Sequence, residues 1–205
     1  MESGSRVPLL AWVLVLAGWI GLIGAVSPGV AQCKVYLTRD RALALYAGDS
    51  LRIETRTAYL TPVQTKAIQD AAEAPFQAAR VTYYVAVDSL GAARLYLYLD
   101  MHTVRTMVET VLIALDREGV VRSVEVLAFH EPEDYLPPSR WLALLPGRSL
   151  DEDLRPGEAM PPISGATLTA RAITDAVRRA LAIHATLEPQ VDQPRASGPS
   201  HEVHE

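Results

Sequence analysis

The sequence predicts an α+β domain, an antiparallel sheet flanked by helices, preceded by an N-terminal apolar helix that is a signal peptide or a membrane anchor. Three observations support this fold class. Residues 8–26 form an uncharged apolar run, several strand-length segments follow one another between residues 81 and 129, and a long amphipathic helix begins near residue 164. Strands joined by short turns indicate antiparallel pairing.

Composition limits the classes of protein that the chain can be. Its 205 residues, 49% of them hydrophobic, are enough for one good core once the terminal segments are set aside. The net charge is −5 and no basic block occurs, which argues against a nucleic-acid partner. Cys33 is the single cysteine, so the chain has no internal disulfide framework.

The apolar run at residues 8–26 has a length between a signal-peptide core and a spanning helix of about 20 residues. Ser27-Pro28-Gly29 would break this helix, and Gly29-Val30-Ala31 has the small-x-small form of a cleavage site. Cys33 raises the alternative of a lipoprotein, but the residues before it match that signal poorly. Residues 1–31 are therefore expected to direct export, either as a cleaved signal peptide or as a retained anchor.

A helix–strand–helix extension is predicted over residues 32–79. Its first helix covers 38–47, with Thr38 or Asp40 as N-cap, and a half-exposed strand follows over 51–59, where apolar and charged residues alternate. Thr61 is expected to cap the second helix, which runs to about residue 74, with Pro62 at its first position.

The middle of the chain is predicted to be a β-sheet. The expected strands are rich in β-branched and aromatic residues, and turn-forming residues at 88–91 and 116–119 separate them in pairs. The predicted strands are 81–87, 93–99, 111–115 and 120–129.

The chain between the sheet and the last helix is rich in proline. Residues 131–138 are expected to form a surface loop and 139–145 a short helix, and 146–162 form either a functional loop or a disordered one. In the long helix that follows, the predicted polar face carries Arg171, Asp175, Arg178 and Arg179. Residues 188–205 lack periodicity and are expected to be a disordered tail, and the spacing of their histidines does not predict a metal site.

The start of the long helix, Ser164-Gly165-Ala166-Thr167-Leu168-Thr169, has the chemistry of a phosphate site. If Ser164 is the N-cap, the amides of the first turn have no intrahelical acceptors, and the helix dipole favours an anion there. Gly165 and Ala166 leave room for a ligand, and the hydroxyls of Ser164 and Thr167 add hydrogen bonds. The alternative is an ordinary helix cap with no ligand.

The letters SGATLT before an amphipathic helix resemble the FMN-binding domain of sodium-pumping NADH:quinone reductases and Rnf complexes, and most of all stand-alone FMN-binding domain proteins of bacterial envelopes. The resemblance covers residues 80–187. It implies that a flavin transferase esterifies the FMN phosphate to Thr167, with Ser164, Gly165, Ala166 and Thr169 around the phosphate. Where the family signature has an aspartate, this chain has Pro161.

Further polar residues are weaker candidates for the flavin site. His102 lies in the segment 100–106, which forms either a pocket or a turn with surface charges. The sequence Phe129-His130-Glu131-Pro132 resembles a loop that lies near the flavin in that family, which makes Glu131 a candidate. Tyr135 and Trp141 either contact the isoalloxazine or belong to the core.

These patterns predict an FMN-binding redox protein that transfers electrons at the extracytoplasmic face of a bacterial membrane, in the periplasm or anchored to the inner membrane. We find no serine elbow, clustered metal ligands or dinucleotide fingerprint in the sequence, so the bound flavin would carry the chemistry. Membrane or periplasmic redox proteins are the expected partners, with the flavin transferase. The alternatives are a sensory or regulatory FMN module and a module that has lost covalent attachment, which Pro161 favours.

Overall fold

The computed structural model describes residues 34–150, 154 and 160–188. The predicted export segment, Cys33 and the tail beyond Glu188 lie outside the described residues. Within the described part of the chain, no helix combines the length and apolar character needed to cross a membrane.

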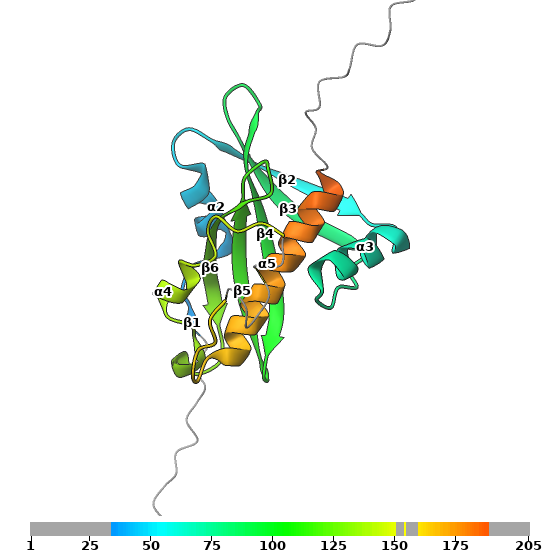
Figure 1. Cartoon of the computed structure of the whole chain (residues 1–205). Coiled ribbons are helices and arrows are strands. Elements are labelled where there is room, and N and C mark those ends of the chain that lie inside the picture. Colours follow the sequence, from blue (N-terminus) through cyan, green and yellow to red (C-terminus); the bar gives the residue numbers. More distant parts are fainter. Residues whose placement is uncertain (1–33, 151–153, 155–159, 189–205) are drawn as a thin grey trace, which may run out of the picture. The chain divides into compact units, whose positions relative to one another are not determined.

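The centre of the structure is a six-stranded antiparallel sheet (Figure 1). Its spatial order is β1-β6-β5-β4-β3-β2, so consecutive strands from β2 to β6 are neighbours and β1 adds to the far edge. This confirms the predicted antiparallel sheet and places the strand of the N-terminal extension in it. The strands are β1 (Lys34–Val35), β2 (Arg52–Tyr59), β3 (Arg80–Val87), β4 (Ala93–Val104), β5 (Met107–Leu115) and β6 (Val121–Phe129).

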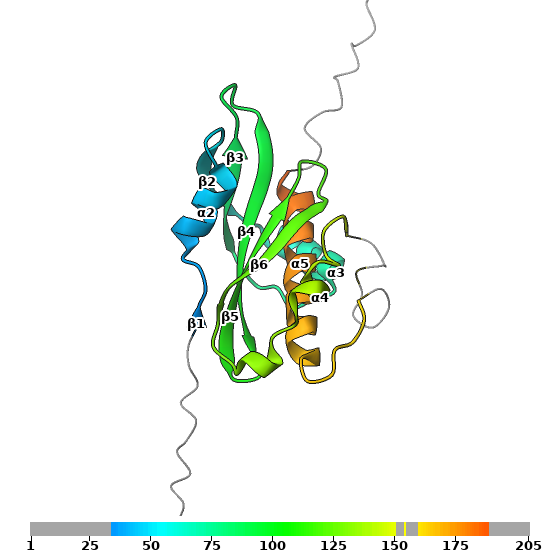
Figure 2. The same cartoon turned by 90° about the vertical axis from the view of Figure 1, so that its left-hand side faces the viewer.

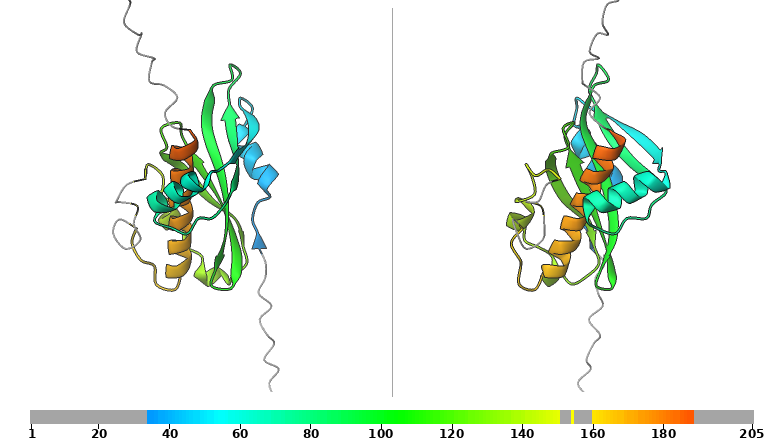
Figure 3. Two further views of the ribbon diagram at one scale, coloured as in Figure 1. Left: turned by 90° about the vertical axis from the view of Figure 1, so that its right-hand side faces the viewer. Right: turned by 45° about the vertical axis from the view of Figure 1, so that its right-hand side comes forward.

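Helices cover both faces of the sheet (Figures 2 and 3). One face carries α3 (Pro62–Ala72) and the long α5 (Thr167–Leu187), which form the larger core with the sheet. The other face carries α2 (Arg39–Ala47) over a smaller core. A 3-10 turn, η1 (Glu133–Tyr135), and the short α4 (Ser139–Leu142) lie in the connection from β6 to α5.

Threonine caps begin α2 and α3, as the sequence predicts. The Thr38 hydroxyl accepts from the Arg41 amide at 3.4 Å. At α3, Thr61 and Gln64 form a reciprocal capping box, with Thr61 Oγ1 accepting from the Gln64 amide at 3.2 Å and Gln64 Oε1 accepting from the Thr61 amide at 3.0 Å. Pro62 follows at the first helical position, where a missing amide proton costs nothing.

The hairpin of β4 and β5 is longer than the sequence predicts. β4 does not end at residue 99 but continues to Val104, and β5 begins at Met107, so only Arg105 and Thr106 form the turn. Arg105 takes a left-handed conformation there, with φ 49°. Of the two alternatives for segment 100–106, a pocket or a turn, the turn is limited to its end, since residues 100–104 pair with β5 and His102 lies in register with Glu109.

Arg178 is buried, although the helical pattern places it on the polar face of α5. Its Nε donates to the Ala72 carbonyl at 2.6 Å and its Nη2 to the Ala71 carbonyl at 3.3 Å. These carbonyls lie at the C-terminal end of α3, where a helix lacks intrahelical donors and favours a cation. Arg178 thus fixes α3 against α5, a contact that helical periodicity alone does not reveal.

Candidate functional site

The first turn of α5 differs from the predicted one. The helix begins at Thr167 with Ala166 as N-cap, so the prediction that Ser164 caps it is wrong. The reason is Gly165, which has φ 86° and turns the chain sharply before the helix. Ser164 is exposed and lies in this turn, while the Ala166 side chain is buried.

α5 begins without a side-chain cap. No described side chain accepts a hydrogen bond from its first turn, in contrast to the threonine-capped α2 and α3. The amides of Thr167, Leu168 and Thr169 thus lack both intrahelical acceptors and a cap, and they lie at the positive end of a 21-residue helix. Free amides at this end are a suitable donor set for an anion such as a phosphate.

A cavity of about 210 Å³ lies beside this uncapped turn. Thr167 and Arg171 line it from one face of α5, and Trp141 lines it from α4. The Trp141 indole donates to the Pro161 carbonyl at 2.9 Å, which fixes the ring in the wall. The full lining is Trp141, Met160, Pro161, Pro162, Thr167, Ala170, Arg171 and Thr174.

Among the hydroxyl residues of the SGATLT segment, Thr167 is the one in the lining of this cavity. Its side chain is exposed, and Oγ1 donates to the Ile163 carbonyl at 2.6 Å. Thr169 is 1% exposed and lies inside the core. Thr174 also lines the cavity, but its hydroxyl is buried and donates to the Ala170 carbonyl at 2.9 Å. An incoming group can therefore reach the Thr167 hydroxyl and not that of Thr169.

Glu131 holds the β4–β5 turn instead of facing this cavity. Its Oε1 accepts from the amides of Thr106 and Met107, both at 2.9 Å, and from the Thr106 hydroxyl at 3.3 Å. The hydrogen bond from the Thr106 amide is the main cause that keeps the pKa of Glu131 below its usual value. Next to it, the Arg105 guanidinium lies 4.1 Å from the Tyr135 ring centre.

The β4–β5 turn, η1 and the start of α5 gather at one end of the molecule (Figure 1). η1 contacts α5, and a Cβ placed on Gly165 would lie 3.8 Å from the Asp134 carbonyl oxygen. Glu131 and Tyr135 therefore support the surroundings of the α5 start, although neither lines the cavity beside Thr167.

His102 belongs to a separate, largely buried network. Its Nδ1 lies 2.9 Å from Asp100 Oδ1 and its Nε2 lies 2.9 Å from Glu109 Oε2. Arg179 binds Asp100 in a bidentate manner, at 2.8 and 2.7 Å. Asp100, His102 and Arg179 line a second cavity of about 480 Å³, which lies between β4, α5 and the loop at residues 75–78 and does not include Thr167.

Burial and hydrogen bonding shift the pKa values of the groups in this network. Burial favours neutral His102, but hydrogen bonds with Asp100 and Glu109 outweigh it and raise the pKa of His102 to about 9. Burial likewise opposes ionisation of Asp100, and its bonds with His102 and Arg179 lower its pKa to about 2. Burial raises the pKa of Glu109, whose Oε1 is buried and has no hydrogen-bond partner among the described residues.

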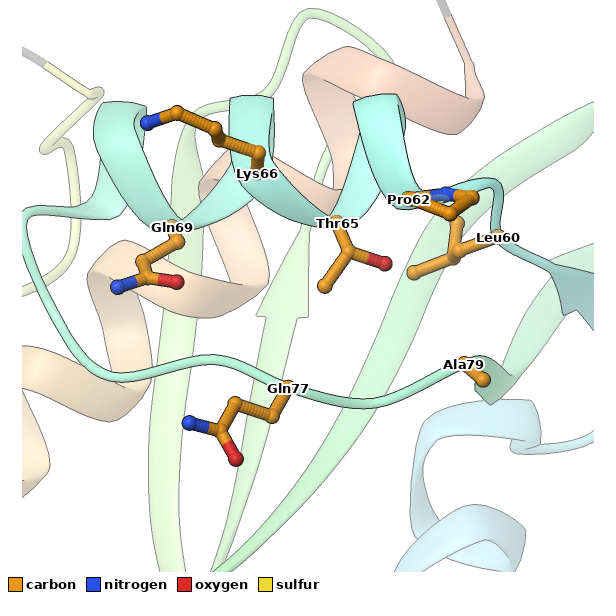
Figure 4. A pocket seen from close by; sticks show the side chains of 7 residues that line it. All are labelled: Leu60, Pro62, Thr65, Lys66, Gln69, Gln77 and Ala79. Atoms are coloured by element: carbon orange, nitrogen blue, oxygen red, sulfur yellow. The ribbon is translucent and has the colours of Figure 1, made fainter.

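A third cavity, of about 320 Å³, lies between α3 and the loop that follows it (Figure 4). Thr65, Lys66 and Gln69 of the helix and Gln77 of the loop are among its lining residues, and in Figure 4 Thr65 and Gln69 point from the helix toward the loop. It shares no residue with the cavity at the start of α5. In the described part of the chain, no group of three or more His, Cys, Asp or Glu side chains is placed to hold a metal ion.

Sequence reasoning missed Arg171, Ala170 and Thr174 as residues of the cavity beside Thr167. Their spacing was the available signal, because positions three, four and seven residues after Thr167 share its helix face. Pro162 and Met160 could not be found in this way, since the path of residues 146–162 has no periodic pattern.

Replacing Gly165 with Ala is expected to destabilise the fold by about 1 kcal/mol, the typical cost of a left-handed backbone at a non-glycine residue. The cost is conformational and not steric, because the new Cβ would meet only the Asp134 carbonyl oxygen, at an ordinary 3.8 Å. Chemical unfolding of both proteins measures it. Gly165→Asn should cost less, because asparagine tolerates this conformation better. Equal costs for Ala and Asn would contradict this explanation.

The residues present fit FMN. The uncapped amides and Arg171 suit the phosphate, the accessible Thr167 hydroxyl lies beside both, and Trp141 offers an aromatic surface for the ring system. A volume of about 210 Å³ is below the ~300–1,000 Å³ of pockets that enclose a whole drug-sized ligand, so the cavity suits one part of FMN.

Residues 108–182 match the family model described as FMN-binding domain, a span that runs from β5 into α5 and includes Thr167 and Arg171. We found no matching protein among those with curated descriptions. The match over residues 108–182 supports an FMN-binding domain in this part of the chain and indicates FMN as the cofactor.

Proposed function

We propose that the protein is an electron-transfer flavoprotein of the extracytoplasmic side of a bacterial membrane. FMN supplies the redox chemistry when it is bound. The polypeptide holds the phosphate at the start of α5, shields part of the flavin beside Trp141, and sets the charge around it. Residues 1–31 serve as the export signal or anchor in this proposal, and the electron partners are membrane or periplasmic redox proteins.

The observation that carries the proposal is the position of the Thr167 hydroxyl. It is exposed, it lies at the uncapped N-terminus of a 21-residue helix, and it lines the same cavity as Trp141 and Arg171. Together these features supply phosphate donors, a nucleophilic hydroxyl and an aromatic wall in one place. An ordinary helix start would have the amide donors but would need neither the accessible hydroxyl nor the aromatic wall.

We further propose that the FMN phosphate is esterified to Thr167. The hydroxyl already lies against the ligand space, and esterification would replace its hydrogen bond to the Ile163 carbonyl. A flavin transferase would be the partner in this step. Thr167 Oγ1 would attack the flavin-side phosphorus of a flavin dinucleotide donor, so that the new P–Oγ1 bond replaces the P–O–P linkage, the nucleoside monophosphate leaves and the hydroxyl proton is released.

A second candidate is a module that holds FMN without a covalent bond. Pro161 favours it, because this position has no carboxylate and contributes its carbonyl to hold Trp141. In this form the uncapped amides of α5 would still bind the phosphate, and Thr167 would serve only as a hydrogen-bond donor.

The experiment that tests the proposal uses the full chain, produced in a bacterium with and without a flavin transferase. Intact-mass spectrometry should show one FMN added only when the transferase is present, and should also show whether the first 31 residues are removed. The visible spectrum should bleach with dithionite and return in air. A colourless protein of unmodified mass in both hosts, which also takes up no added FMN, would refute flavin binding.

A further inference from the structure

We propose that Arg171 binds the phosphate of FMN and thereby makes the site prefer FMN over riboflavin. This inference rests on the proposed flavin function and adds a specificity-determining residue to it. The match with the FMN-binding domain covers position 171 but does not assign it a role.

The geometry of α5 places Arg171 next to the ester position. Residues four apart on a helix have Cβ atoms about 5–6 Å apart, and Thr167 and Arg171 both line the cavity. Helical side chains lean toward the N-terminus of their helix. From this position the long Arg171 side chain is able to reach back to Thr167 and to the uncapped first turn.

Arg171 is also the arginine of α5 that other contacts leave available. Arg178 is engaged with the α3 carbonyls and Arg179 with the Asp100 carboxylate. Within the described residues, exposed Arg171 forms neither an ion pair with a carboxylate nor a side-chain hydrogen bond.

Asp175, one turn further along α5, does not engage the Arg171 guanidinium in an ion pair. Burial raises the pKa of Asp175, and Arg171 is the strongest of the nearby cations that oppose this rise. The two side chains therefore feel each other's charge without forming a contact ion pair, and the guanidinium can turn toward a phosphate.

A guanidinium and a phosphate form charge-assisted hydrogen bonds that are often bidentate. The free helix amides contribute to the same anion, while the terminal hydroxyl of riboflavin carries no charge for either group to stabilise. Loss of Arg171 should therefore weaken the binding of FMN and leave the binding of riboflavin nearly unchanged. Because the site is exposed, added salt should reduce the preference in the wild-type protein.

The test measures FMN and riboflavin affinity by flavin-fluorescence titration of the full chain, produced without a flavin transferase. Arg171→Gln should lower the ratio of FMN to riboflavin affinity by about tenfold, which corresponds to about 1.4 kcal/mol. Arg171→Lys keeps the charge but not the bidentate geometry and should lower it less. Arg94→Gln is the matched control. Exposed Arg94 lies near the start of β4, pairs with Asp88 and does not line the cavity beside Thr167, so the affinity ratio should not change.

Different outcomes separate the two proposals. If wild-type protein prefers FMN and Arg171→Gln keeps the same ratio, the role of Arg171 is refuted and flavin binding stands. Equal weakening of both flavins would also refute it, since Arg171 would then contact the ring or support the pocket. If the wild-type protein binds neither flavin, the proposed function fails together with this inference.

Discussion

Thr167→Ala protein, produced with a flavin transferase, is expected to carry no covalent flavin. The substitution removes the one hydroxyl of the SGATLT segment that lines the cavity, and Thr169 cannot replace it because its side chain is 1% exposed. Thr167 is exposed and its lost hydrogen bond to Ile163 is local, so the fold should persist. Flavin fluorescence on a denaturing gel and intact mass measure the effect, which should be complete.

Two variants serve as controls for this loss. Ser164→Ala removes an exposed hydroxyl of the same segment and should leave the covalent flavin in place. Thr167→Ser keeps a hydroxyl at the same position and should retain at least part of the signal. A fluorescent band that survives in Thr167→Ala would place the ester elsewhere, and a band lost equally in Ser164→Ala would indicate damage to the turn instead of loss of the acceptor.

The sequence predicts the body of the fold well because local signals are strong there. The caps at Thr38 and Thr61, the turns around Gly91 and Gly119, and the end of α5 at Leu187 all follow from short-range chemistry. The antiparallel order from β2 to β6 follows from the short turns. β1 was missed because a two-residue strand carries no pattern of its own, and its pairing with β6 is a long-range contact.

The errors fall where tertiary contacts override local patterns. The polar residues of segment 100–106 indicate either a pocket or a turn. In the structure Asp100 and His102 lie inside paired strands and line a cavity, and His102 contacts Glu109 Oε2 across the hairpin. Periodicity assigns Arg178 to the solvent face, but the side chain is buried and donates to a carbonyl at the end of α3. Which partner meets a charged side chain depends on elements far along the chain, so periodicity cannot reveal it.

The candidate site was predictable in part. The SGATLT letters located Thr167, and the structure adds that its hydroxyl alone in that segment reaches the cavity. The prediction that Ser164 caps the helix is wrong because Gly165 adopts a positive φ and turns the chain before the helix begins. The sequence alone does not show this conformation, since serine is also a common N-cap. Helical periodicity identifies Arg171 only as a polar-face residue, although its distance of four positions from Thr167 places the two on the same face of the helix.

The network around His102 has an energetic role that is separate from the flavin cavity. His102 lies between the carboxylates of Asp100 and Glu109, with Arg179 on the far side of Asp100 and half-buried Asp175 nearby. Its side chain is 12% exposed and that of Glu109 is 0% exposed. Removal of the His102 imidazolium would leave the carboxylates of Asp100 and Glu109 each with one partner fewer. A buried charge that loses its partner is strongly destabilising.

His102→Gln is therefore expected to lower the free energy of unfolding by about 3 kcal/mol near pH 6, as loss of one partner from a buried pair typically does. The effect should depend on pH, because the pKa of His102 is raised to about 9 from 6.5 in the folded protein. A raised pKa contributes stability that is fully present below pH 6.5 and is lost as the pH rises through about 9. Urea unfolding at several pH values should therefore show that the difference in free energy of unfolding between wild type and His102→Gln shrinks from pH 6.5 to 9.5. His130→Gln, which removes a ring bonded to the Val108 carbonyl at 2.7 Å, is the matched control and should cost less near pH 6. A constant difference between wild type and His102→Gln across this range would mean that His102 stabilises the fold by packing and not by its charge.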